Sequence, residues 1–246
     1  MLPPENGGQR ESVGGGSQAI PVSQRRGAEK NYSKPGCAAG NPIEGRIQDF
    51  MQALIVVDAQ NEFSPEGLRA VPGHAGYLER IHRRVQEARE EKQPIAWVRH
   101  YNRPNESRAF VPKTWGSELS PGLGPQDGFG PEKLFEKDVF GAFSGTSLEE
   151  WLRSLGVSEV LLAGFFTHMC VSTSAREALV RGFEVKIDAD ATGAHDVKHP
   201  VLGQLTAAEV KKSALLHLSD MGVRIEQAAA HQAESPGKKR VATINA

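Results

Sequence analysis

Cysteine and long apolar runs are both scarce in this 246-residue chain. Its two cysteines, Cys37 and Cys170, lie far apart and form no C-x-x-C pair. This spacing argues against a disulfide framework or a cysteine-rich zinc site, and it favours a reducing cytosol. No apolar run approaches the roughly 18 residues that span a bilayer, and no signal-peptide pattern is visible. We therefore expect a cytoplasmic protein that does not enter a membrane.

A strong net charge is also missing, because the formal charge at pH 7 is −1. No basic field indicates nucleic acid, and no acidic block indicates a cationic partner. The chain does have apolar side chains, which make up 39% of its residues. That share supports a sizeable core, and the length fits one α/β domain with tails or two small domains.

The two ends lack the residues that build a core. Residues 1–50 are rich in Gly, Ser, Pro and charged residues, and residues 228–246 have a similarly loose composition. Such segments cannot bury enough apolar surface to offset the entropy of ordering. We expect a disordered N-terminal tail and a flexible C-terminal tail on either side of one folded domain at residues 51–227. A transit peptide at the start is a weaker alternative, because acidic residues are unusual in one.

Between the tails, short apolar runs alternate with amphipathic segments. Continuous apolar runs predict buried parallel strands, and apolar residues at helical spacing predict helices that cover a sheet. The expected strands are 53–58, 94–100, 133–138, 159–165, 184–190 and 223–227. The expected helices are 74–92, one from a Thr146 capping box to Gly156, 170–181, and one from Thr206 to about 221. This order predicts a three-layer α-β-α fold of the α/β class, with a doubly wound, mainly parallel six-stranded sheet.

Three polar residues follow strands of this sheet. Asp58 closes the first expected strand, Lys137 lies near the end of the third, and Cys170 follows the fourth at the start of a helix. Parallel strands bring these ends to one edge of the sheet, where ligands bind in such folds. The helix N-terminus and a nearby lysine favour the reactive thiolate. Asp58 can accept the thiol proton and later return it to a leaving amine, while backbone amides bind an oxyanion.

Each of these residues also has a structural explanation. A free cysteine is among the most buried residue types, and an aspartate at a strand end often forms a turn or a cap. A lysine late in a strand is usually a solvated charge. Considered together, the three residues support a catalytic role and a structural role about equally.

Four motifs resemble those of the isochorismatase-like cysteine hydrolases. They are VVDAQNEF at 56–63, TWGSEL at 114–119, KDVFGAFSGTSLEEWL at 137–152 and GFFTHMCV at 164–171. They occur in the family's order and at ordinary spacing, from about residue 52 to 226. The four together make the resemblance specific, where any one alone is weak.

The resemblance implies a doubly wound fold and a Cys-Asp-Lys triad. Carried over by position, Cys170 is the nucleophile, Asp58 the general base and Lys137 the positive group that holds both in register. The resemblance also implies a cis peptide at Phe165–Phe166, which turns the Phe166 amide toward the substrate. That amide and the amide of Cys170 then form the oxyanion hole. The implied reaction attacks an amide-type carbonyl, releases ammonia or an amine and hydrolyses a thioester, with no cofactor.

Departures from the family pattern narrow the substrate. Nicotinamidases carry an Asp-x-His metal motif after the second strand, whereas this chain has Val98-Arg99-His100, so we expect no metal. A strand-end His100 is more typical of a hydrogen-bonded residue than of a ligand. The retained Cys170 favours amide or carbamoyl cleavage over the vinyl-ether cleavage of isochorismatases proper, which lack the cysteine.

His168 stands where many members of the family have Asn. For His168 and for each aromatic candidate, a packing role is the alternative. Six side chains are candidates for contact with the substrate. They are Phe63, Trp115, Glu118, Phe143, Phe165 and His168. His195 and His199 follow the fifth strand near the same edge, and we expect both to be solvent-exposed loop residues.

The leading hypothesis is a metal-independent hydrolase that cleaves a C–N bond of a small amide, ureido or cyclic imide compound. A nucleotide-binding module is a second hypothesis, although no GxGxxG or Walker loop follows the first strand. A catalytically silent scaffold or ligand-binding module of the same fold is a third. We expect a homo-oligomer, a dimer or tetramer, because members of the family commonly assemble in this way.

Overall fold

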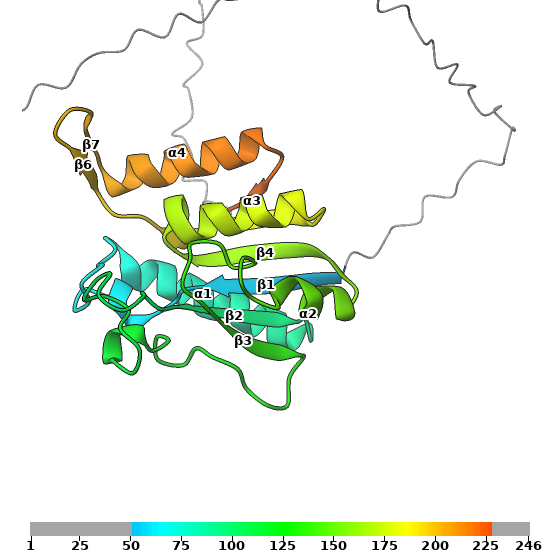
Figure 1. The fold of residues 1–246 in the computed structure, drawn as a ribbon. Coiled ribbons are helices and arrows are strands. Elements are labelled where there is room, and N and C mark those ends of the chain that lie inside the picture. Colours follow the sequence, from blue (N-terminus) through cyan, green and yellow to red (C-terminus); the bar gives the residue numbers. More distant parts are fainter. Residues whose placement is uncertain (1–50, 228–246) are drawn as a thin grey trace, which may run out of the picture. The chain divides into compact units, whose positions relative to one another are not determined.

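The computed structural model describes residues 51–227, so the tails expected at 1–50 and 228–246 lie outside the described residues. Six strands form one sheet in the order β3-β2-β1-β4-β5-β8, of which Figure 1 labels β3, β2, β1 and β4. All neighbouring strands are parallel. Their bounds are Met51–Val57 for β1, Ile95–His100 for β2, Glu132–Lys137 for β3, Val157–Phe165 for β4, Glu184–Gly193 for β5 and Arg224–Glu226 for β8. The predicted six-stranded parallel sheet is confirmed.

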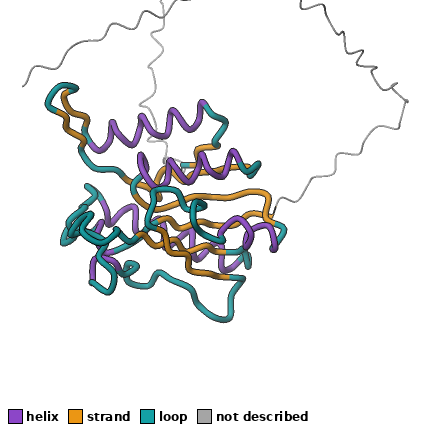
Figure 2. Tube along the Cα trace, viewed as in Figure 1, coloured by secondary structure: helices purple, strands orange, loops and turns teal. Residues whose placement is uncertain are grey.

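Helices cover both faces of the sheet, so that the strands lie between helical segments (Figure 2). Successive side chains of β1 point to opposite faces of the sheet, so each face has apolar residues that the helices cover. Leu54 and Val56 pack in the core cluster that contains Ile81 of α1. Ile55 and Val57 pack in the other cluster, which α2, α3 and α4 cover. The helix bounds are His74–Glu90 for α1, Leu148–Ser154 for α2, Ser172–Val180 for α3 and Ala207–Asp220 for α4. None of these helices is long and apolar enough to cross a membrane.

The capping box predicted at Thr146 is not formed. Its hydroxyl donates a hydrogen bond to the Ala142 carbonyl at 2.6 Å and accepts one from the Leu148 amide at 3.3 Å. Ser147 is the N-cap residue of α2 and makes no side-chain capping bond. The prediction was wrong because α2 begins one residue later than expected, with Ser147 as its N-cap residue, so Glu149 does not occupy the third helical position that a capping box requires. A complete capping box does begin α4, between Thr206 and Glu209.

Two further details differ from the sequence expectation. A short antiparallel hairpin, β6 (Val197–His199) with β7 (Gly203–Leu205), lies between β5 and α4. It escaped prediction because its strands are three residues long and exposed on both faces, so they lack an apolar alternation. The helix expected at 170–181 begins instead with a π-helical turn, Thr167–Val171, which α3 follows.

Candidate active site

Asp58 occupies the bend directly after β1. Its backbone φ is 51°, and its amide donates a hydrogen bond to the Val98 carbonyl of β2 at 2.9 Å. Aspartate tolerates this left-handed conformation better than most residues. The Cβ of any residue at the neighbouring Gly164 would lie 1.8 Å from the Val57 carbonyl oxygen, so β4 approaches this bend closely only because glycine stands there. The carboxylate is consequently held, fully buried, between β2 and β4.

Lys137 is the last residue of β3, and its ammonium meets this carboxylate. The Nζ atom donates to Asp58 Oδ2 at 2.7 Å and to the Val139 carbonyl at 3.2 Å, and it lies 3.3 Å from His100 Nδ1. These three partners match the three N–H donors of an ammonium. Burial lowers the pKa of Lys137, but its interactions with Asp58 and Cys170 together outweigh this effect, and the pKa lies above its ordinary value. Lys137 is therefore a charged cation inside the protein.

His100 completes the surroundings of the lysine. Since Nδ1 faces an ammonium, this nitrogen accepts, and the ring proton lies on Nε2, which is 2.9 Å from Asn102 Oδ1. Burial and the charge of Lys137 lower the pKa of His100. The imidazole is thus neutral and both of its nitrogens are engaged.

Cys170 lies in the π-helical turn after β4, with 7% of its surface exposed. Burial raises the pKa of its thiol well above the ordinary range, and the negative charge of Asp58 adds to this effect, while Lys137 opposes it. Lys137 thus favours the thiolate, as expected, but desolvation and the Asp58 carboxylate outweigh it. Asp58 Oδ1 is buried and has no hydrogen-bond partner among residues 51–227. A neutral thiol thus stands beside a carboxylate that has one oxygen free to accept a proton.

The peptide bond Phe165–Phe166 is cis, as the resemblance implies. The Cys170 turn that follows is tied to the loop after β3, because Ser174 Oγ donates to the Cys170 carbonyl at 2.6 Å and accepts from the Ala142 amide at 3.0 Å. The segments that carry Cys170 and Lys137 are in this way fixed to one another.

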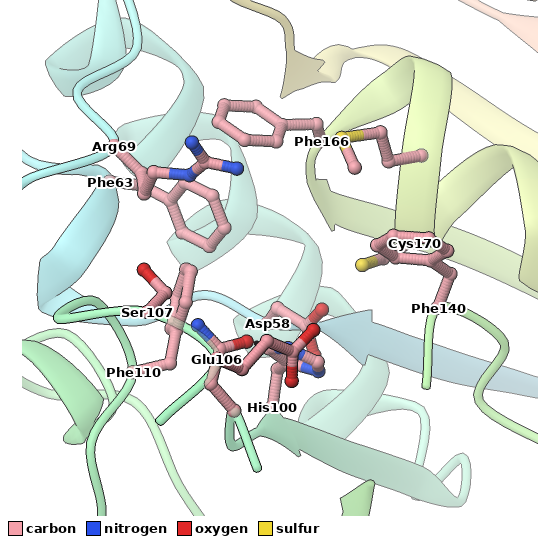
Figure 3. Close-up of a pocket in the computed structure, with 12 residues that line it drawn as sticks. Asp58, Phe63, Arg69, His100, Glu106, Ser107, Phe110, Phe140, Phe166 and Cys170 are labelled. Atoms are coloured by element: carbon pink, nitrogen blue, oxygen red, sulfur yellow. Dashed lines mark hydrogen bonds between the residues drawn. The ribbon is translucent and has the colours of Figure 1, made fainter. Parts of the chain in front are cut away.

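A cavity of about 340 Å³ opens next to these residues (Figure 3). Asp58 and Cys170 contribute to its wall, while Lys137 lies behind them. Aromatic side chains form much of the rest, with polar groups between them. The other lining residues are Phe63, Phe110, Phe140, Phe166, Met169, Arg69, His100, Asn102, Glu106 and Ser107.

Of the six side chains expected to contact substrate, Phe63 lies in this wall. Trp115 is 52% exposed, and Glu118 is also exposed. Phe143 is 4% exposed and packs against Phe183 in the core cluster of α2 and α3. None of these three lines the cavity, because Phe143 turns into the core and the other two turn toward solvent.

Phe165 and His168 also lie outside the cavity wall. Phe165 is fully buried and stacks on His74 at a centroid distance of 5.3 Å. His168 packs against the Phe166 ring at 5.4 Å and against His195 at 5.1 Å. His168 therefore packs against Phe166, which lines the cavity, without lining the cavity itself.

The two later histidines differ from each other. His199 is exposed as expected, although it lies in β6 and not in a loop. His195 is half-buried, with its ring 4.6 Å from that of Phe166, so the expectation of an exposed residue was wrong for it. The aromatic contact with Phe166 withdraws part of the imidazole from water.

Sequence reasoning missed most of the polar wall. Arg69 lies in the loop after the short helical turn Asn61–Phe63, and Asn102, Glu106 and Ser107 lie in the loop after β2. Loops show no periodicity, so no pattern marked which of their side chains point inward. The sequence predicted only the lining residues close to strand ends, such as His100.

The residues around the strand ends do not fit a metal ion. Val98 offers no ligand, and both nitrogens of His100 are engaged with Lys137 and Asn102. Within residues 51–227, no group of three or more His, Cys, Asp or Glu side chains has a metal-binding arrangement. The polar groups at the strand ends are therefore an ion pair and a neutral imidazole that bond to one another, and not a set of metal ligands.

This chain is similar to known proteins in sequence and in structure. A family model described as the isochorismatase domain matches residues 52–214. The secreted isochorismatase effector Isc1 of Verticillium dahliae is 30% identical over 180 residues, 73% of this chain and 88% of that protein. Nicotinamidase 3 of Arabidopsis thaliana is 31% identical over 150 residues, 57% of this chain and 72% of that protein. The crystal structure of an isochorismatase from Pseudomonas putida matches with a TM-score of 0.66 and 29% identity, covering 72% of this chain and 88% of that one.

Proposed function

Since this chain belongs to the isochorismatase family, we propose that Cys170, Asp58 and Lys137 are the catalytic triad of a metal-independent cysteine hydrolase. The enzyme acts on a non-peptide C–N bond of the amide type, in keeping with its similarity to nicotinamidase 3. Its substrate is a small amide, ureido or cyclic imide compound. The observation that carries the proposal is the buried pair of Lys137 and Asp58, 2.7 Å apart, in contact with the cavity that Cys170 lines.

The first step joins proton transfer to attack. The resting thiol is neutral, because burial and Asp58 raise its pKa. Its proton passes to Asp58 Oδ1 as sulfur forms a bond to the substrate carbonyl carbon, and the carbonyl π pair becomes an oxyanion. Lys137 offsets the charge that Asp58 carries before this transfer. Removing the proton only during attack avoids the cost of a buried thiolate.

The intermediate then collapses to a thioester. The amides of Phe166 and Cys170 donate hydrogen bonds to the oxyanion. The C–N bond breaks and the nitrogen takes the proton from Asp58, leaving as ammonia or an amine, or remaining in the ring-opened product as an amide when the substrate is a cyclic imide. Water, deprotonated by Asp58, then attacks the thioester carbonyl. The C–S bond breaks, the acyl group leaves as a carboxylic or carbamic acid, and the sulfur takes the proton back from Asp58.

The discriminating test uses Cys170→Ala and Cys170→Ser in the full chain. Product formation is measured over a panel of small amides, ureides and cyclic imides, as ammonia or amine release for the first two and as ring opening for the imides. We expect both variants to lose at least about a thousandfold in activity, since the nucleophile is gone. Retained activity in Cys170→Ala, with unchanged thermal unfolding, would contradict the mechanism. A catalytically silent scaffold predicts instead that the unaltered enzyme hydrolyses none of the panel.

Location and assembly are also proposals. A reducing cytoplasm suits the free thiol of Cys170, although one relative is named as secreted. A homo-oligomer, a dimer or tetramer, is expected because members of the family commonly assemble in this way. Cell fractionation tests the first point, and sedimentation velocity, in which a monomer would contradict the proposal, tests the second.

A further inference from the structure

Arg69 is a cavity-lining arginine whose guanidinium has no hydrogen bond or ion pair among residues 51–227. Most other arginines are committed to structure. Arg84 bonds Asp188 at 2.5 Å, and Arg89 forms a two-pronged pair with Glu132 at 2.8 and 3.0 Å. An arginine left uncommitted in the wall of a cavity is available to bind a ligand.

The backbone around Arg69 is fixed. The Leu68 amide donates to the buried Glu62 carboxylate at 2.8 Å, and the Arg69 amide donates to the Glu62 carbonyl at 3.1 Å. Two residues later, the Val71 amide donates to the Phe63 carbonyl at 3.0 Å. These bonds hold the loop against the short helical turn that carries Phe63. The Arg69 side chain is therefore presented from a rigid base, which reduces the entropy lost when it binds a ligand.

The charges of the cavity are separated in space. Figure 3 draws the Arg69 guanidinium beside the rings of Phe63 and Phe166, whereas Glu106 lies with Asp58 and His100 in another part of the wall. The two rings contact each other edge to face, 4.7 Å between centroids. The part of the cavity around Arg69 is thus aromatic and positively charged.

We propose that Arg69 binds a carboxylate of the substrate, so that the preferred substrate is a small, flat amide or ureide that carries an anionic group. This inference rests on the proposed function, since it names the substrate class of the same site. A guanidinium and a carboxylate form paired, charge-assisted hydrogen bonds. Lys137 cannot bind this carboxylate, because its ammonium is bonded to Asp58. The aromatic walls favour a planar body between the anion and the reacting carbonyl.

Binding is measured first, in Cys170→Ser so that no probe is consumed. The two probes are 4-carbamoylbenzoate and terephthalamide, which share ring and amide and differ in one carboxylate. By calorimetry we expect 4-carbamoylbenzoate to bind more tightly. Adding Arg69→Ala weakens its binding roughly 10- to 100-fold and changes terephthalamide by less than about threefold. Arg69→Lys recovers part of the affinity, because it keeps the charge without the planar fork.

The matched control is Arg108→Ala. Arg108 is an exposed arginine next to the cavity-lining Ser107, but it is not itself part of the wall. Both arginines are exposed, but Arg108 does not line the cavity, so its loss removes the same net charge and leaves both affinities within about twofold. Equal loss for both probes, equal effects of the two arginine variants, or no difference between the probes, including no measurable binding of either, overturns the assignment.

Turnover separates this inference from the proposed function. With Cys170 intact, Arg69→Ala lowers kcat/KM for 4-carbamoylbenzoate and spares that for terephthalamide. If both are spared, the carboxylate role fails while the hydrolase stands. If Cys170→Ser hydrolyses either probe as fast as the unaltered enzyme, the mechanism itself fails.

Discussion

The edge of the sheet and the loops beside it are built in opposite ways. At the edge, the side chains of Asp58 and Lys137 are fully buried and bonded at 2.7 Å. In the loops, Phe140 is 53% exposed, and the Arg69 guanidinium has no partner within the described part of the chain. Both regions line or support the same cavity.

The difference separates two tasks. Groups that transfer protons need fixed distances, and parallel strands supply these through their hydrogen-bonded register, in which His100 pairs with Lys137. Groups that select a substrate need a shape and charge that vary with the ligand, and exposed loops supply these. We expect changes at the edge to affect both stability and catalysis, and changes in the loop wall to affect mainly binding.

The largest effect is expected from Lys137→Met. Removing the ammonium leaves the Asp58 carboxylate buried without its partner, which costs about 3–5 kcal/mol of unfolding free energy. Hydrolysis is lost as well. Denaturant unfolding and ammonia release measure the two effects.

Lys133→Met is the control, because Lys133 is exposed on the same strand, and we expect a change within about 0.5 kcal/mol. The double variant with Asp58→Asn and Lys137→Met is expected to be less destabilised than Lys137→Met alone.

The ion pair also predicts a pH dependence. Because the pKa of Lys137 is raised in the folded protein, its contribution to the free energy of unfolding is complete below the ordinary lysine pKa of about 10.5. That contribution is lost as the pH rises through the folded pKa. A Lys137→Met penalty that already declines between pH 6 and 9 would contradict the ion pair.

The two phenylalanines after β3 sharpen the comparison. Phe143 is 4% exposed, so Phe143→Ala costs about 3–5 kcal/mol through the cavity it leaves. Phe140 lines the substrate cavity and is half exposed, so Phe140→Ala costs less than about 1 kcal/mol and raises KM several-fold. Thermal unfolding and steady-state kinetics of the two variants give the comparison. If Phe140→Ala and Phe143→Ala lowered the unfolding temperature equally, the cavity loop would contribute to stability as much as the core does.

Asp58→Asn tests the control of the thiol. Asp58 adds to the effect of burial in raising the Cys170 pKa, so its neutralisation lowers that pKa and exposes more thiolate at neutral pH. We expect alkylation of Cys170 at pH 8 to become about tenfold faster, the equivalent of one pKa unit, while hydrolysis is lost. Mass spectrometry distinguishes Cys170 from Cys37. Slower labelling in the variant would mean that Asp58 favours the thiolate.

The smallest effect concerns His168. Burial, with the charges of His195 and Arg69, lowers its pKa to about 4. The folded ring therefore stays neutral while the unfolded one gains a proton below about pH 6.5, so stability is full above that pH and falls toward pH 4. His168→Asn should remove about 1 kcal/mol of the loss between pH 7.5 and 5, allowing for its partial exposure. His199→Asn, at an exposed position, serves as the control and leaves the pH dependence unchanged.

The strand-end residues were accessible to sequence reasoning because apolar runs mark strands, and parallel strands bring their ends together. The cis bond at Phe165–Phe166 was accessible only through the family motif. Trp115 and Glu118, expected in the cavity from their motif, face solvent, while Arg69 and Glu106 lie in its wall without any pattern to mark them. The orientation of a loop side chain depends on long-range contacts, such as that between the Glu62 carboxylate and the Phe110 amide, which no local signal encodes.

By itself the sequence determined the layered α/β fold and the strand ends at which Asp58, Lys137 and Cys170 sit, since both follow from short-range apolar patterning. Only the tertiary structure decided the charge state of those groups and the composition of the cavity. A thiol's pKa depends on how much water and how many charges surround it, and these are set by segments more than 100 residues apart in the chain: Asp58 and Cys170 meet through the sheet.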